Sequence, residues 1–364
     1  MIPAPDDDYL ASSNLRRQHR RCRPQHLMSG QSPSHARGLR TTILRSVSRS
    51  FYLSIRLLPQ KLREPIALAY LLARTTDTVA DTTRIPVSVR MESLRMLSDG
   101  IQGKCTREMV VNQAAAFLPL QETAAERILL DSLPDCLEWL EQTGKADRDD
   151  IRAVLEKIAH GQMLDLHRFH HPAQVRALQT AADLDEYTYL VAGCVGEFWT
   201  RLCFRHVKDF ASLTQDEMLA LGRRYGMALQ LINVLRDAGT DLRGGRCYFP
   251  DDELVAIGLN AAQILSEPDR FQPIYQRWME KAQDSLVCGM QYSHAVLNRR
   301  VRAATVLPAL IGARTLALLR QAGVSALHQT IKVPRREVRS MLVSLAIHLA
   351  SREKIDAIFS RTKL

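Results

Sequence analysis

The chain has 364 residues, of which 46% are hydrophobic and 24% charged, as is ordinary for a globular protein with a substantial core. Its 49 Lys and Arg against 39 Asp and Glu give a net charge of +10, which favours anionic partners such as phosphorylated small molecules or an acidic membrane surface. Nucleic acid is not expected, because basic and aromatic residues are not interleaved and no known nucleic-acid-binding module is present. The seven cysteines form no CxxC pair, so we expect reduced thiols, a cytoplasmic location and no structural zinc.

The first 40 residues hold part of the excess positive charge, in "LRRQHRRCRPQH". No apolar run follows these arginines, so the segment is not a secretion signal. A disordered basic arm over 1–40 is one interpretation, and a membrane-surface tether is the other. No transmembrane segment is expected. The apolar run "MLVSLAIHLA" near the C-terminus is about half of the roughly twenty residues that a bilayer requires, and Ser344 and His348 interrupt it.

From residue 41 to 364 the sequence predicts one all-α domain. Apolar residues recur at helical spacing in several long segments, whereas alternating strand patterns with hairpin turns are absent. The predicted helices include 66–79, 151–166, 187–204, 218–235 and 301–319. Breaks are predicted at 84–88, 143–150, 170–174, 243–253 and 332–337, none of them long enough to be a flexible linker.

The first predicted helix contains "YLLARTTDTVADT", in which two aspartates lie four residues apart. With Tyr70 as the reference and a rotation of about 100° per residue, Arg74, Asp77 and Asp81 fall within a stripe about 60° wide. The rest of this segment is mainly apolar. The four polar side chains therefore share one face of the helix.

A second stripe lies in "LQLINVLRDAGTDLRGGRCYFP" and repeats the same spacing. It consists of Gln230, Asn233, Asp237 and Asp241. Gly222 and Gly226 lie on the same side of this helix and leave room in front of the stripe. Gly239 leaves open whether Asp241 belongs to the helix, to a final turn or to a loop.

One DxxxD motif is weak evidence, because solvated carboxylates at this spacing are common. Two stripes flanked by amides and arginine are more specific, since grouped carboxylates repel each other unless a cation binds them. Ligands that are all oxygen atoms indicate Mg²⁺, which combines a few carboxylates with water and substrate phosphates. The candidates for binding those phosphates are Arg49, Arg74, Arg236 and Arg246. The stripes thus predict a site for magnesium and a diphosphate.

The sequence resembles the squalene and phytoene synthase family, the head-to-head isoprenoid synthases. The resemblance rests on "SVSRSFYLSIRLLP", "YLLARTTDTVAD", "YTYLVAGCVG", "LQLINVLRDAGTDLRGGRCYFP" and "TVLPALIGARTLALL", which follow in the family's order and cover most of the chain beyond residue 46. It implies an isoprenoid-synthase fold, a helical bundle around a central apolar channel. It also implies a reaction that joins two prenyl diphosphates through their C1 atoms by way of a cyclopropyl diphosphate.

The resemblance assigns roles to individual residues. Asp77 and Asp81 would form a first Mg²⁺–diphosphate cluster, and Asn233, Asp237 and Asp241 a second. The expected diphosphate-binding residues are Ser48, Arg49, Ser50, Arg74, Gln230 and Arg236. Tyr70 would lie beside them, and Tyr187 occupies the place of the tyrosine thought to manage the proton lost on ring closure. "LVAGCVGEFW" and "ATVLPALIGA" would line the channel or serve ordinary helix packing.

Within the family, "YLLARTTDTVADT" is similar to bacterial squalene synthases. This implies condensation of two farnesyl diphosphates to presqualene diphosphate and its reduction by NADPH to squalene. The segment "TIKVPRREV" resembles the basic segment in which Lys332 or Arg335 would contact an NADPH phosphate; a solvated basic loop is the alternative. Dehydrosqualene or phytoene synthase, which needs no reduction, is the second candidate. Peripheral membrane contact through the arm or the tail from Val338 would suit a C30 hydrocarbon product.

Two further interpretations bear on function. "DLHRFHH" groups Asp165 with His167, His170 and His171, but no third transition-metal ligand is evident and polar surface is the simpler interpretation. The family often carries an acid at the position of Asp165, without a role that the sequence defines. A catalytically silent relative that acts in assembly or lipid binding is the rival class. Retention of the four aspartates, Arg74, Arg236 and Tyr187 favours an enzyme.

Overall fold

The structure is a computed structural model that describes residues 55–170, 174–348 and 351–362. All of them belong to one compact unit, Thr41–Leu364. The basic segment 1–40 lies outside the described residues, as do Ser48, Arg49 and Ser50. Their predicted roles therefore stay predictions.

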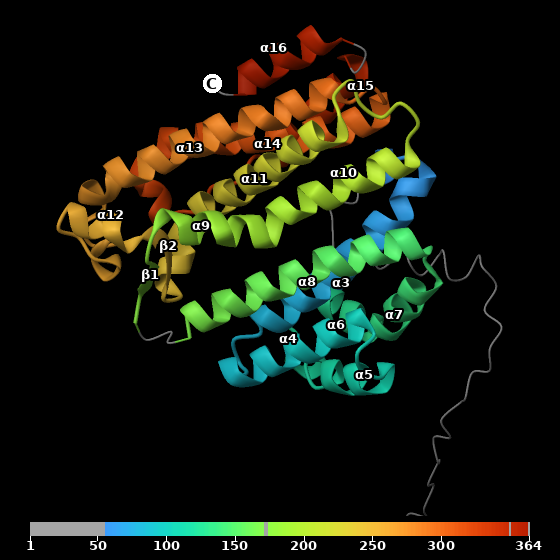
Figure 1. The fold of residues 1–364 in the computed structure, drawn as a ribbon. Coiled ribbons are helices and arrows are strands. Elements are labelled where there is room, and N and C mark those ends of the chain that lie inside the picture. The colour runs from blue at the N-terminus through green and yellow to red at the C-terminus, as the bar shows by residue number, and fades with distance from the viewer. Residues whose placement is uncertain (1–54, 171–173, 349–350, 363–364) are drawn as a thin grey trace, which may run out of the picture. The chain divides into compact units, whose positions relative to one another are not determined.

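The described residues fold mainly as a succession of helices, as the periodicity predicts (Figure 1). The first half comprises α3 (Gln60–Asp81), α4 (Val87–Gln102), α5 (Arg107–Ala115), η1 (Leu118–Leu120), α6 (Ala124–Asp131), α7 (Leu133–Gln142) and α8 (Lys145–Arg168). The second half comprises β1 (Arg176–Leu178), α9 (Ala181–Thr188), the π-helical turn η2 (Tyr189–Gly193), α10 (Cys194–His206), α11 (Gln215–Arg243), β2 (Arg246–Pro250), α12 (Asp251–Ala256), η3 (Ala261–Gln263), α13 (Pro268–Ala295), α14 (Arg299–Ala322), η4 (Gly323–Leu327), α15 (Arg335–His348) and α16 (Arg352–Thr362).

Two hydrophobic clusters form the core. One lies mainly among α3, α4, α7, α8 and α10, and the other is built around α11, α13 and α14. In Figure 1, α3 and α8 run side by side, while α11 lies among α10, α13 and α14. The two helices that carry the predicted stripes, α3 and α11, therefore belong to different clusters.

Helix α3 is amphipathic in a way that fixes where its carboxylates point. Leu62, Ile66, Leu72 and Val79 recur at helical spacing and are buried in the first cluster. Near the C-terminal end of the helix, Asp77 points away from Leu72 and Val79, about 140° and about 160° around the axis from them. The apolar packing therefore sets the rotation of the helix and with it the direction of the acidic stripe.

Helix α11 continues through Gly239 to Arg243, so Asp241 is helical and not part of a loop. A Cβ atom at Gly239 would lie 1.8 Å from the carbonyl oxygen of Leu327, in η4. Glycine here permits a close backbone approach, and the helix is stabilised by tertiary packing despite its low helix propensity.

Two details differ from the sequence prediction. The break predicted at 143–150 is much shorter, because Gly144 is the N-cap and α8 already begins at Lys145. A short parallel pair of strands, β1 and β2, joins Arg176 to Arg246 in register, where no strand was expected. This pair holds the chain after α11 against the chain before α9. The six described cysteines form no disulfide with one another.

One described segment, Arg299–Leu327, is long and apolar enough to cross a membrane by length and composition. However, 78% of its most apolar window is buried inside the protein. The packing of α14 in the second cluster therefore accounts for its apolar residues.

The substitution Gly239→Ala tests the close contact between α11 and η4. An added methyl would overlap the Leu327 carbonyl, so we expect a loss of unfolding free energy of about 1–3 kcal/mol in urea denaturation. Gly144→Ala is the control, because no atom lies within 4 Å of its added Cβ and only a small capping preference, under about 1 kcal/mol, is lost. Equal stability of the two variants would contradict the contact.

Candidate active site

A polar cavity of about 430 Å³ is bordered by α3, α8, α9, η2, α11 and β2. Its lining brings together residues from both predicted stripes, which are far apart in the sequence. The lining residues are Arg74, Asp77, Ala80, Asp81, Gln162, Asp165, Leu166, Tyr187, Val191, Gln230, Asn233, Arg236, Asp237, Arg246 and Tyr248. The predicted convergence of the two stripes is thus present.

On the α3 side, the threonines of "RTTDTVADT" do not compete for the site. The hydroxyls of Thr75 and Thr78 donate to the carbonyls of Leu71 and Arg74, one turn earlier, each at 2.9 Å. The aspartates remain directed at the cavity. Arg74 pairs with Asp77 at 3.7 Å and with Glu126 of α6 at 3.3 Å, and the Gln162 amide donates to Asp77.

On the α11 side, the polar residues form a chain of hydrogen bonds along the helix. The Arg236 guanidinium donates to the Asn233 oxygen and to Asp237, each at 2.9 Å. The Asn233 amide in turn donates to the Gln230 oxygen at 3.2 Å. Arginine and amide groups thus hold the second stripe in place.

Arg246 of β2 links three elements. Its guanidinium lies 3.0 Å from Asp241 on α11 and 3.8 Å from Asp165 on α8. Asp241 itself is not among the residues that line the cavity and lies behind Arg246. The Tyr248 hydroxyl donates to Asp165 at 2.7 Å, and the Tyr248 ring stacks on Tyr187 with centroids 4.8 Å apart. The β1–β2 pair therefore positions the arginine and the tyrosine pair together.

Burial raises the pKa values of several carboxyl groups and of a tyrosine in this site. Burial, with the nearby charge of Asp81, raises the pKa of Asp77 to about 6. Burial raises the pKa of Asp241 to about 7 although Arg246 opposes the shift, and it also raises the pKa values of Asp81 and Asp165. Burial likewise raises the pKa of Tyr187 above its ordinary value, so its hydroxyl stays protonated near neutral pH.

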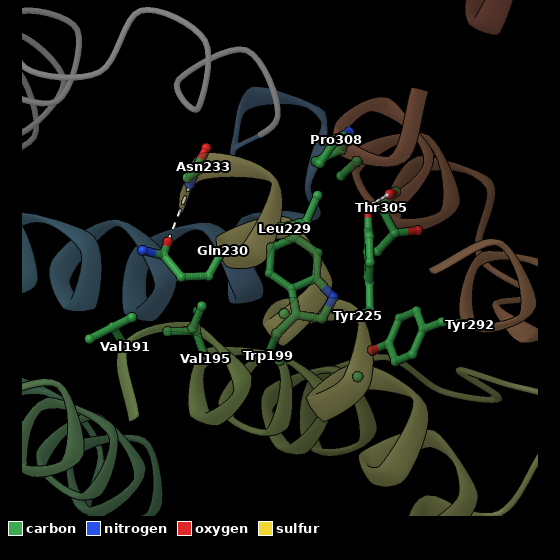
Figure 2. Close-up of a pocket in the computed structure, with 15 residues that line it drawn as sticks. Val191, Val195, Trp199, Tyr225, Leu229, Gln230, Asn233, Tyr292, Thr305 and Pro308 are labelled. Carbon is green, nitrogen blue, oxygen red and sulfur yellow. Dashed lines mark hydrogen bonds between the residues drawn. The ribbon is translucent and has the colours of Figure 1, made fainter. Parts of the chain in front are cut away.

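An apolar cavity of about 290 Å³ adjoins the polar one and shares Val191, Gln230 and Asn233 with it (Figure 2). Trp199 and Leu229 project into it. The hydroxyls of the two tyrosines in its lining are hydrogen-bonded elsewhere, Tyr225 to the Thr305 carbonyl and Tyr292 to Thr200. Within the described part of the chain, the buried Trp199 indole N–H has no hydrogen-bond partner. The space therefore offers few polar groups to a bound molecule.

Glycines set the spacing of the helices along this apolar cavity. A Cβ atom at Gly196 would lie 1.9 Å from the Gly222 carbonyl oxygen, and one at Gly226 would lie 2.3 Å from that of Ala192. The residues of "LVAGCVGEFW" thus serve both helix packing and the cavity lining.

The donor set fits an oxygen-preferring cation, although no three Asp, Glu, His or Cys side chains of the described segments form a metal site alone. Asp77, Asp81 and Asp237 and the Asn233 amide supply oxygen atoms around the cavity. The buried Gln162 amide oxygen beside Asp77 has no hydrogen-bond partner among the residues that the structure describes. Such a set suits Mg²⁺ when a substrate provides phosphate oxygens as further ligands.

Some predicted residues lie elsewhere. Tyr70 is partly buried against the first cluster and does not line either cavity. Lys332 borders a separate cavity beside α14, and Arg335 is exposed at the start of α15. His167 and His170 stack with ring centroids 6.1 Å apart, and His171 lies outside the described residues.

Three site residues carried no signal of their own in the sequence: Gln162, Tyr248 and Glu126. Gln162 shares α8 with Asp165, three residues away, but that spacing alone is common. Tyr248 follows Arg246 in the strand that was not predicted. These residues reach the site only through the tertiary fold.

The sequence profile described as squalene/phytoene synthase matches residues 44–337, most of the chain. The chain belongs to the squalene/phytoene synthase family. A presqualene diphosphate synthase of Sinorhizobium fredii is 27% identical over 88% of this chain and 100% of its own length. A bifunctional lycopene cyclase/phytoene synthase of Leptosphaeria maculans is 29% identical over 62% of this chain. That match spans only 36% of the fungal protein.

Among solved structures, a dehydrosqualene synthase in complex with a ligand superposes with a TM-score of 0.61. The two sequences are 20% identical, and the superposition covers 87% of this chain and 98% of the other. The isoprenoid-synthase fold expected for the family is therefore confirmed.

The pH dependence of stability tests whether burial raises the pKa of the site's carboxyl groups. Asp241 is a better probe than Asp77, because its side chain is only 14% exposed and that of Asp77 is 44% exposed. Folding raises its pKa from 3.8 to about 7, so the folded protein holds this proton more tightly than the unfolded chain. The ligand-free protein should lose stability as pH rises from about 4 to about 7, this group contributing at most about 1.4 kcal/mol per pH unit.

Asp241→Asn should flatten this slope, and Asp284→Asn, at an exposed position of α13, should preserve it. The measurement is the free energy of unfolding in urea at each pH, without Mg²⁺. A variant at Asp241 with the wild-type slope would contradict the raised pKa.

Proposed function

We propose that this protein condenses two farnesyl diphosphates head to head to presqualene diphosphate and reduces that intermediate with NADPH to squalene. The observation that supports this most directly is the junction of the two cavities. A site with carboxylates and arginines opens onto an apolar space through the shared residues Val191, Gln230 and Asn233. A molecule with a diphosphate head and a hydrocarbon tail matches both parts.

The first bond to break would be that between C1 of one substrate and its diphosphate oxygen, with the electron pair leaving on the diphosphate. Arg74, Arg236 and Arg246 lie where they could stabilise that departing charge. In the ligand-free protein they pair with Asp77, Asp237 and Asp241, respectively. Bound Mg²⁺, held by Asp77, Asp81, Asp237 and Asn233, would supply Lewis-acid stabilisation of the diphosphates, while Asp241 holds Arg246.

The allylic cation left at C1 would be attacked by the C2–C3 double bond of the second substrate. The bond to C2 leaves a cation at C3 of the second substrate. Loss of a proton from C1 of the first substrate, whose C–H electron pair forms the bond to C3, would then close the cyclopropane ring. Water must be kept away from the cation, and the lining by Val195, Trp199 and Leu229 provides an apolar surface for that purpose.

Tyr187 is the candidate for handling the proton lost on ring closure. Its ring stacks on Tyr248, whose hydroxyl is hydrogen-bonded to the buried Asp165. Burial keeps the Tyr187 hydroxyl protonated, so its oxygen can accept a hydrogen bond but can take up a proton only if it passes its own proton to another group. Asp165, with its raised pKa, lies next to this tyrosine pair and is a second group that could take part.

The final product has two further candidates. Dehydrosqualene or phytoene would form if the reaction ends by proton loss instead of reduction. Presqualene diphosphate itself would be released if the chain resembles its full-length relative in activity as well as in sequence. A catalytically silent relative would have no reason to keep four aspartates, three of them partly buried, beside three arginines, since grouped carboxylates repel each other without a bound cation.

The substitutions Asp77→Asn and Asp237→Asn test the metal assignment. Each removes a negative charge with little change in shape, so we expect product formation from radiolabelled farnesyl diphosphate and Mg²⁺ to fall at least about 100-fold while the fold is retained. Circular dichroism checks the fold, and Asp284→Asn serves as the control. Near-normal turnover in either site variant would rule out the proposed ligand set.

The product assay is run with and without NADPH and read by mass spectrometry. Squalene that depends on NADPH supports the proposal, whereas dehydrosqualene under both conditions supports the alternative without reduction. The phytoene alternative requires the same assay with geranylgeranyl diphosphate, since phytoene has 40 carbons. Presqualene diphosphate under both conditions supports release of the intermediate. Absence of any condensation product would favour the silent relative.

The NADPH contact has its own test. The double substitution Lys332→Gln with Arg335→Gln should raise the KM for NADPH at least about tenfold by removing charge-assisted contacts to phosphate. Presqualene diphosphate formation should stay unchanged, and Arg336→Gln, at the exposed neighbouring position, is the control. An unaltered KM would show that "TIKVPRREV" is a solvated basic loop.

A further inference from the structure

A second charged cavity, of about 640 Å³, lies where α14 and α16 begin. It is lined by Leu297, Arg299, Arg302, Ser351, Arg352 and Glu353. Three guanidinium groups thus surround one space that holds a single carboxylate. No part of this lining is shared with the two cavities of the candidate active site.

The arginine charges are not neutralised by their neighbours. Within 55–170, 174–348 and 351–362, neither Arg299, Arg302 nor Arg352 lies within 4 Å of a carboxylate, so Glu353 forms no ion pair with them. Arg302 is only 6% exposed, and its guanidinium donates twice to the Val296 carbonyl, at 2.9 and 2.7 Å. Burial, together with Arg352 and Arg299, lowers its pKa.

A buried cation bonded only to a carbonyl, with two more cations nearby, is an unfavourable arrangement unless an anion offsets it. The backbone adds to the positive potential, because two helices start at the cavity. Asn298 caps α14, and the Ser351 hydroxyl accepts from the Lys354 N–H in the first turn of α16. The helix dipoles therefore place their positive ends at the same space.

The cavity is remote from the aspartates. Ala211 pairs with Val296 four residues before α11 begins, which places the start of α11 beside this cavity. Asp237 lies further along the same helix, about 33 Å from Gln215 along its axis. The cavity therefore cannot serve as a subsite for the diphosphates of the proposed reaction.

We infer that this cavity is a second anion site, which binds a phosphate group through Arg299, Arg302 and Arg352. The phosphate can come from a soluble molecule or from the headgroup of an anionic lipid. Exposed apolar side chains would favour the lipid source, since they could contact a membrane. They are Leu297, which is 42% exposed and lines the cavity, and Val343 and Ile347 of the preceding helix α15. The inference is independent of which reaction the active site performs.

The test uses a double variant that carries both Arg299→Gln and Arg352→Gln. It is compared with the wild type and with the control variant Arg300→Gln. Arg300 is exposed on the same helix end but does not line the cavity, so the control changes the net charge without changing the site. Arg302 is not substituted, because its guanidinium donates hydrogen bonds to the Val296 carbonyl and its loss could disturb the local fold.

The first measurement is amide hydrogen exchange of the full chain with inorganic phosphate and no Mg²⁺. Peptides that cover 296–303 and 351–356 should exchange about tenfold more slowly when phosphate is at about ten times its Kd. The slowing should occur in the wild type and the control and be lost in the double variant. Peptides around 74–81 and 233–241 report any separate binding at the active site.

The second measurement is cosedimentation with vesicles of phosphatidylglycerol or of phosphatidylcholine. Weaker binding of the double variant than of the control to phosphatidylglycerol alone would identify a lipid headgroup as the source. Local protection by phosphate with equal vesicle binding would identify a soluble phosphate. No local protection and no difference between variants would overturn the inference, and so would an equal loss in the control.

Discussion

Carboxylates that are close together and poorly hydrated are the constraint on which the active site of this protein depends. Asp77, Asp81 and Asp241 bind protons more tightly than free aspartates because burial disfavours their charge. Arg246 and the other guanidinium groups supply the counter-charge in the ligand-free protein. The arrangement is stable enough to fold, yet it leaves oxygen atoms such as that of Gln162 without a partner. A cation and a diphosphate together would satisfy both kinds of group.

The position of these groups follows from how the core is divided. Helix α3 packs its apolar face into one hydrophobic cluster and α11 packs into the other, so their polar stripes meet across the space between. The short β1–β2 pair adds Arg246 and Tyr248 to the same space. Directly beyond Gln230 and Asn233 the lining turns apolar. One helix, α11, thus lines both cavities, with Asp237 in the polar one and Leu229 in the apolar one.

Much of this arrangement could be predicted from the sequence, and the exceptions share a physical cause. Helical periodicity placed Asp77 and Asp81 on one face because apolar residues fix the rotation of α3. The same reasoning could not decide whether Asp241 is helical, because Gly239 has a low helix propensity. The Leu327 carbonyl that packs against Gly239 is distant in sequence. Tyr248 was missed because β2 is too short for an alternating pattern to appear. Contacts between remote segments decide these cases, and local spacing does not report them.

The glycine contact between α10 and α11 has a consequence for how this cavity can diversify. Where Gly196 meets Gly222, backbone touches backbone, so the distance between the two helix axes does not depend on any side chain. Val195, Trp199 and Leu229 can therefore grow or shrink while the surrounding scaffold keeps its dimensions. Single replacements at these three positions would therefore change the volume of the apolar cavity and leave the polar cavity beside it unaltered.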